Sequence, residues 1–156
     1  MGAVSLPTPA LVHAFDVEVR LGALEDHGVT RAGHRRVVPI VGGTISRGLD
    51  AVILGGGADW QLVRADGSVE IDGRYSARTP QGELLYLHAV GVRSGEPAVL
   101  EALLRGEPVD PAAYYFRTTV TIETSAPRLA HLERSVYVTA AEREAAVVRY
   151  AAYRVT

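Results

Sequence analysis

The chain has 156 residues, of which 47% are apolar and 22% are charged, and its formal net charge is -2. This length predicts one domain with room for a sizeable core. The weak negative charge argues against nucleic acid and against anionic membranes as partners, because both attract basic proteins. The absence of cysteine excludes disulfides and thiolate chemistry.

The 16 basic residues are all arginine, which rules out Schiff-base catalysis and lysine-dependent phosphate loops. The chain does not begin with a basic and apolar leader pattern, and no apolar run reaches the length of a membrane span. We therefore expect a cytoplasmic protein without a membrane partner.

Residues 1–10 contain prolines and small residues and are predicted to form a loose arm ahead of a single domain over 11–156. From 11 to 21 apolar and charged residues alternate, which is the period of a half-buried strand. Residues 22–33 are polar and turn-rich, and are predicted to be a loop. The further predicted strands are 34–45, 51–54, 58–64, 69–78, 84–93, 114–124, 132–139 and 147–155.

Turn and helix signals complete the outline. Asp66-Gly67 lies between two extended runs and predicts a tight hairpin turn of the primed type. One helix is predicted over 97–105, where Pro97 suits the first turn and Gly106 follows as a stop. Eight or nine short strands at regular spacing favour an all-β sandwich or barrel, and an eight-stranded barrel leaves room for one small ligand.

Several runs resemble the microbial family known as domain of unknown function 3237. They are residues 39–44, 56–64, 72–75, 91–93, 106–110 and 114–119, in the expected order over nearly the whole chain. The resemblance implies a closed antiparallel barrel similar to that of plant allene oxide cyclase. Proteins of that barrel shape include cofactor-free cyclases, isomerases and dirigent proteins. Because one fold hosts many functions, the step from barrel to chemistry is an analogy.

Asp59-Trp60 is the sharpest local signal, because neighbours in a strand point to opposite faces and only one of the two can enter a barrel. If Asp59 points inward, its carboxylate is a candidate catalytic base or an orienting group. If Trp60 points inward, it is part of the core or a wall against the substrate, and Asp59 lies on a turn. The sequence leaves both orientations open.

Arg74-Tyr75 poses the same question one strand later. The face of Arg74 is charged and the face of Tyr75 is apolar. One interpretation is a solvated charged stripe. The alternative is a polar lumen in which Arg74 is a catalytic anchor for an anionic or carbonyl-bearing substrate. Tyr75 is a candidate for substrate binding.

Two more pairs of side chains share a strand face at a spacing of two residues. Tyr86 and His88 are candidates for substrate binding, and Tyr115 and Arg117 are candidates for catalysis. A buried tyrosine commonly needs only a partner for its hydroxyl. In a dry cavity, however, tyrosine and arginine can polarise a carbonyl while histidine or aspartate moves a proton.

His131 and Glu133 stand where the resembled family leads us to expect tryptophan and asparagine. They are two residues apart, and we expect them to share one face of an extended segment. A carboxylate beside a histidine raises the imidazole pKa, which suits general acid–base work, so His131 is a catalytic candidate and Glu133 a binding candidate. A surface ion pair is the alternative.

Taken together, these features lead to the hypothesis of a cofactor-independent enzyme that isomerises, cyclises or dehydrates a small apolar carbonyl or phenolic compound inside the barrel. We expect no cofactor and no metal, because the five histidines are scattered without ligand spacing. One alternative is a non-catalytic protein that binds a small hydrophobic ligand. Another is a structural homo-oligomer, and the apolar strand 84–92 favours a two-fold dimer.

Overall fold

A computed structural model describes residues 2–156, and these residues contain one ten-stranded antiparallel sheet. The strands are β1 (Leu11–Leu21), β2 (Glu25–Thr30), β3 (Gly33–Ser46), β4 (Ala51–Ile53), β5 (Gly57–Val63), β6 (Val69–Arg78), β7 (Leu84–Gly95), β8 (Tyr114–Glu123), β9 (Val136–Arg143) and β10 (Val147–Val155). The helices are α1 (Pro97–Leu104) and two 3-10 helices, η1 (Pro111–Ala113) and η2 (Pro127–Glu133).

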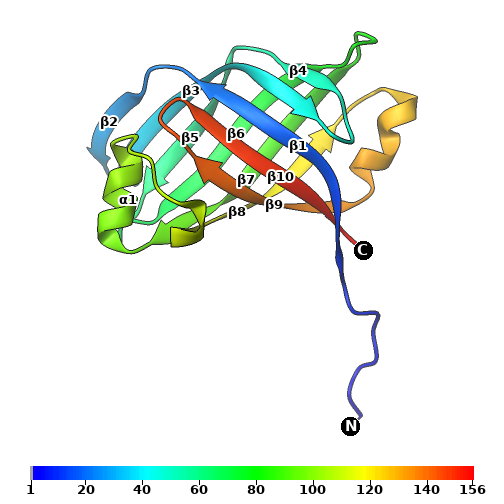
Figure 1. Cartoon of the computed structure of the whole chain (residues 1–156), viewed down its shortest axis with the longest axis horizontal. Helices are drawn as coiled ribbons and strands as arrows, with labels where there is room; N and C mark the ends of the chain where they lie inside the picture. The colour runs from blue at the N-terminus through cyan, green and yellow to red at the C-terminus, as the bar shows by residue number, and fades with distance from the viewer. Residues whose placement is uncertain (1) are drawn as a thin grey trace.

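The sheet closes on itself through β1, which pairs with β10 on one side and with β3 on the other. From β1 the order runs through β10, β9, β8, β7 and β6 to β3, and both β4 and β5 lie between β6 and β3. Eight strand positions thus form a closed barrel, with β2 attached to β3 as a hairpin (Figure 1). This confirms the predicted closed antiparallel barrel.

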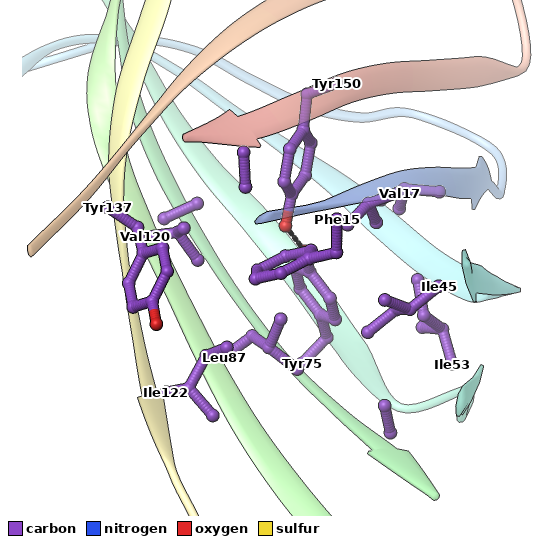
Figure 2. Close-up of a cluster of buried hydrophobic side chains, with 14 of the residues drawn as sticks. Phe15, Val17, Ile45, Ile53, Tyr75, Leu87, Val120, Ile122, Tyr137 and Tyr150 are labelled. Atoms are coloured by element: carbon purple, nitrogen blue, oxygen red, sulfur yellow. Dashed lines mark hydrogen bonds between the residues drawn. The ribbon is translucent and has the colours of Figure 1, made fainter. Parts of the chain in front are cut away.

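Alternation along each strand separates a buried inner face from an outer face. In β8 it is complete: Tyr114, Phe116 and Thr118 are buried, while Tyr115 and Arg117 between them are exposed. The inward side chains of all the strands around the barrel meet in one core, which Figure 2 shows in part. A side chain's place in the strand therefore decides whether it reaches the interior.

The two ends of the barrel are covered by α1 and η2, which lie at opposite ends in Figure 1. Leu100 and Leu103 of α1 are buried, and so are Leu129 and Leu132 of η2. The predicted helix over 97–105 is confirmed as α1, which starts at its proline as expected. Both helices use leucines three residues apart to close the interior.

The structure differs from the sequence prediction in two segments. The predicted loop 22–33 contains strand β2, whose residues are almost all exposed, so no apolar alternation could reveal it. The predicted strand 132–139 begins as helix η2, and β9 starts only at Val136. The buried leucines of η2 have helical rather than strand spacing.

The turn at Asp66-Gly67 forms where it was predicted but is not of the primed type. Within residues 2–156 Arg47 is the one non-glycine residue with positive φ, so Asp66 does not have the left-handed conformation that a type I′ turn requires. Gly67 alone has a positive φ, of 85°. Its N–H donates to Arg64 O at 2.9 Å, and the Asp66 carboxylate accepts from the Ser68 N–H.

Residues 2–10 are exposed and contain neither helix nor strand. The part of the chain that the structure describes has no helix with the length and apolar character needed to cross a membrane.

Burial in the barrel predicts unequal effects for two leucines of β7 that lie on opposite faces. Leu87 is 0% exposed and Leu84 is 52% exposed. We expect Leu87→Ala to lower the free energy of unfolding by about 2–5 kcal/mol, because it leaves a cavity. Leu84→Ala, the matched control, should change it by about 0.5 kcal/mol or less. Chemical denaturation of both variants checks this, and equal losses would contradict the inward assignment.

Candidate functional site

A cavity of about 50 Å³ lies inside the barrel. Its wall is mostly apolar, and the polar side chains that line it are Asp59, Tyr75, Thr118, Arg143 and Tyr150. A mostly apolar wall with a few convergent polar groups is the usual lining of a small-molecule site, and this cavity of about 50 Å³ is smaller than the common range of ~300–1,000 Å³.

The cavity exists because small residues replace large ones on three strands. Gly73 of β6, Ala89 of β7 and Ala141 of β9 all line it. Gly73 pairs with Ala89 on one side and with Asp59 on the other. A Cβ on Gly73 would meet Ala89 O only at 3.9 Å, so close packing does not require the glycine and its small size leaves the space open.

Half-exposed lining residues mark where the cavity approaches the surface. Leu21 ends β1, Arg143 ends β9, and Val148 lies near the start of β10; all three line the cavity and are partly exposed. The Leu21 N–H donates to Ala146 O in the β9–β10 turn at 2.9 Å. The cavity therefore approaches solvent beside this turn.

Asp59 is held in the wall by two hydrogen bonds. Its Oδ2 accepts from Gln61 Nε2 and its Oδ1 accepts from the Asp72 backbone N–H, each at 2.9 Å. The β5–β6 pairing joins Asp59 to Gly73 and resumes at Leu62, so the carboxylate serves as the acceptor where the ladder is interrupted. Burial raises the pKa of Asp59 despite these bonds and the nearby arginines.

Two arginines on inward-facing strand positions, Arg93 and Arg143, are close enough to influence the charge of this carboxylate, and Arg36 is also buried inside the barrel. Burial lowers the pKa of Arg36, of Arg143 and of Arg93, the last to about 10. Arg36 donates to Leu104 O of α1 at 3.4 Å, and the Arg93 guanidinium lies 5.4 Å from the centre of the Phe116 ring. The charges of Arg93 and Arg143 influence Asp59, whereas the carboxylate that influences Arg36 is that of Asp26.

Several buried polar atoms at this end of the barrel have no hydrogen-bond partner within residues 2–156. They are Arg36 Nε, Gln61 Oε1, Arg93 Nε, Arg93 Nη1 and Arg143 Nε. Buried donors without a partner are costly, and buried cations need a counter-charge. The guanidinium groups of Arg93 and Arg143 act on the single Asp59 carboxylate, and this excess of positive charge favours an anionic or strongly accepting oxygen.

Tyr75 and Tyr150 form a bridge across the barrel. They come from β6 and β10, which have three strand positions between them in either direction around the closed sheet. Their hydroxyls are hydrogen-bonded to each other, as the dashed line in Figure 2 shows. Burial raises the pKa of both phenols, so both keep their protons near neutral pH.

Of the residues singled out in the sequence, Asp59 and Tyr75 line the cavity. Trp60 is on the outer face and 40% exposed, so Asp59 is the member of its pair that points inward. Arg74 is exposed and forms an ion pair with Asp72. Of the two interpretations of its strand face, this fits a solvated charged stripe and not a polar lumen. The structure thus brings together two of the predicted site residues.

The outer face of β6 and β7 carries another of the predicted pairs. His88 Nε2 and the Asp72 carboxylate are 2.7 Å apart, and both side chains are partly exposed. Tyr86 is half-buried beside them on the same face of β7. Tyr115 and Arg117 lie on the outer face of β8, with the guanidinium 5.5 Å from the ring centre.

His131 and Glu133 require a correction, because they lie in η2 and not in an extended segment. Both are exposed, and neither lines the barrel cavity. Glu133 Oε2 accepts from the Thr124 N–H at 3.4 Å. The departure from the expected tryptophan and asparagine therefore falls on the outside of the end that η2 covers.

Sequence reasoning missed Gln61, Arg93, Arg143 and Tyr150, although alternation could have found them. Arg93 continues the series of inward-facing residues that begins with Leu85. It was missed because a charged residue at the end of a strand ordinarily points to solvent. Arg143 follows Tyr137 at even spacing, and the predicted strand ended at 139. Within residues 2–156 no group of three or more His, Asp or Glu lies close enough together to hold a metal ion.

Comparison with known proteins places the chain among sequences of unassigned function. It matches the family described as Protein of unknown function (DUF3237) over residues 9–155. A UPF0311 protein of Rhodopseudomonas palustris is 36% identical over 140 residues, covering 89% of this chain and 92% of that protein. A UPF0311 protein of Clostridium acetobutylicum is 38% identical over 112 residues, 71% of each.

Solved structures share the barrel. A conserved protein of unknown function from Rhodopseudomonas palustris has a TM-score of 0.91 at 34% identity and covers 97% of this chain and 100% of its own. A β-barrel-like protein from Acinetobacter baumannii has a TM-score of 0.84 at 38% identity, with coverages of 99% and 100%. An enzyme from Penicillium herquei, at a TM-score of 0.72, 17% identity and 100% coverage of both chains, shares the fold alone.

The environments of two aspartates predict opposite pKa shifts. Burial raises the pKa of Asp59 above its ordinary value of 3.8, whereas the Ser68 hydroxyl and backbone N–H lower the pKa of Asp66. A ¹³C NMR titration of the carboxyl carbons should therefore show Asp59 titrating at higher pH than Asp66 in the same sample. The reverse order would contradict the desolvation of the Asp59 carboxyl group.

The same shift predicts how Asp59 changes stability with pH. Below pH 3.8 the residue is protonated in both the folded and the unfolded chain, so it has no effect. As the pH rises through the folded pKa, the unfolded state loses its proton first, and the free energy of unfolding falls. Relative to Asp59→Asn, the wild type should thus lose stability over this range. Denaturation at several pH values checks this, with Asp50→Asn, an exposed control, expected to follow the wild type.

Proposed function

The chain belongs to the DUF3237 family, whose function is unknown, and we propose that it is an enzyme that catalyses proton transfer on a small carbonyl or phenolic compound inside its barrel. The observation that carries the proposal is the placement of Asp59 and Arg143 on one mostly apolar cavity. A carboxylate that can exchange a proton and a cation that can hold an oxygen are the two groups that such chemistry needs.

The reaction step uses the chain's own side chains. The Asp59 carboxylate takes a proton from the carbon next to a carbonyl, the C–H electrons form a C=C bond, and the negative charge moves to the oxygen. The Arg143 guanidinium stabilises this oxygen. Protonated Asp59 then returns the proton to the same carbon or to another carbon along the conjugated system, which gives an isomer. No atom or electron is gained or lost.

The electrostatics of the site suit this step. A base works best when its pKa is near the working pH, and burial moves the pKa of Asp59 upward in that direction. The surplus of buried guanidinium groups favours the enolate or phenolate over the neutral compound. The mostly apolar walls lower the local dielectric, which makes both interactions stronger than in water.

The alternative is a protein that binds the same compound without changing it. The hydrogen bonds that hold Asp59 and the raised pKa would also suit a carboxyl group that only orients a ligand. The two functions differ in what happens to the protons of the bound compound, which solution NMR follows directly.

Exchange of carbon-bound protons tests the enzyme function. Cyclohexanone in D₂O should lose its α-proton NMR signals faster with the protein than without it. Asp59→Asn should slow this catalysed exchange by about 100-fold or more, because general acid–base groups contribute on that scale. Asp50→Asn should leave the rate unchanged. Binding without any catalysed exchange across a panel of small enolisable ketones would favour the carrier function instead.

Filling the cavity tests whether the chemistry occurs there. Gly73→Val places methyl groups into the space that the glycine leaves, and valine suits a strand. We expect catalysed exchange and cyclohexanone binding to be lost while the thermal unfolding temperature is kept or raised. Ser76→Val, on the outer face of the same strand, is the matched control and should keep both. Undiminished exchange in a folded Gly73→Val protein would place the reaction elsewhere.

A further inference from the structure

The Tyr75–Tyr150 bridge has a donor proton to spare. Each phenol hydroxyl carries one proton, and the bond between the two hydroxyls uses only one of them. Neither hydroxyl has another hydrogen bond in the described part of the chain, residues 2–156. The pair therefore retains one O–H that can donate, and both side chains line the cavity.

The bridge also has a defined position relative to the polar groups. It spans the barrel between β6 and β10, whereas Asp59 belongs to β5 and Arg143 to the end of β9 beside the half-exposed opening. On the other side of the bridge the interior is filled by large apolar side chains such as Phe15 and Leu87 (Figure 2). The tyrosine pair is thus the polar floor of the cavity.

We propose that the spare proton of the Tyr75–Tyr150 pair donates a hydrogen bond to a second oxygen of the bound compound. The natural substrate is then a small compound with oxygen functions at both ends of a short apolar body. One oxygen lies against Arg143 and Asp59, and the other lies against the tyrosine floor. This deepens the proposed function and rests on it for the identity of the cavity as the substrate site.

The chemistry of the pair supports a donor role. Burial raises the pKa of both phenols, which keeps them protonated at neutral pH and makes a ketone, aldehyde or hydroxyl oxygen the matching partner. A hydroxyl that already accepts a hydrogen bond is polarised and donates a stronger one. A compound with a single oxygen bound at Arg143 would leave this donor unmatched at the floor.

Two probes that differ by one carbonyl test the proposal through binding alone. Cyclohexane-1,4-dione and cyclohexanone have the same ring, and their Kd values are compared in the wild type and in Tyr75→Phe/Tyr150→Phe. The double variant removes both hydroxyls and keeps both rings, so it should fold. In the wild type we expect the dione to bind about threefold to tenfold more tightly than cyclohexanone, and we expect this preference to be lost in the variant.

The wild-type protein gives a second measurement that needs no variant. With tyrosine labelled at ¹³Cζ, the dione should shift the Tyr75 and Tyr150 signals more than cyclohexanone does, while the exposed Tyr115 stays unchanged. Equal preference in wild type and double variant, equal shifts by both probes, or no dione binding would each overturn the proposal. Catalysed exchange by Asp59 is measured separately, so loss of the enzyme function and loss of the floor contact are told apart.

Discussion

The pairing of β1 with both β3 and β10 is the constraint on which the rest of the structure depends. It turns an open sheet into a barrel, so each strand of the barrel acquires an inside and an outside and pairs along both of its edges. Once the sheet is closed, each inward side chain must pack against the others or border a cavity. At the candidate site small residues leave that packing incomplete.

The tyrosine bridge divides this interior into two unlike halves. Toward η2, the barrel is filled by leucine, isoleucine and aromatic side chains, as in an ordinary hydrophobic core. Toward α1, Gly73 and two alanines leave a cavity, and charged side chains replace apolar ones. The first half supplies stability and the second supplies a chamber, so a change at the floor affects binding without dismantling the core.

Much of the fold follows from the sequence, because period-two alternation and turn residues report burial on one face. Strand β2 was not predicted because almost all of its residues are exposed, and the end of η2 falls where the sequence predicts the start of a strand, although its buried leucines have helical spacing. The site was less predictable. Asp59 was found, but Arg93 and Arg143 sit at strand ends, where a charged residue ordinarily points to solvent. Only the helix and turn that cover this end turn those positions into interior ones.

The polar end of the barrel contains buried charged side chains whose burial does not stabilise the fold. Arg36, Arg93 and Arg143 occupy inward positions where apolar side chains would give a more stable core, and several of their nitrogens have no partner within residues 2–156. Burial raises the pKa of Asp59 and lowers the pKa of the arginines, so it disfavours the charged form of each of these groups. An oxygen that carries negative charge would relieve the arginines most. The features that weaken this end as a core are therefore those that suit it to hold an enolate or phenolate.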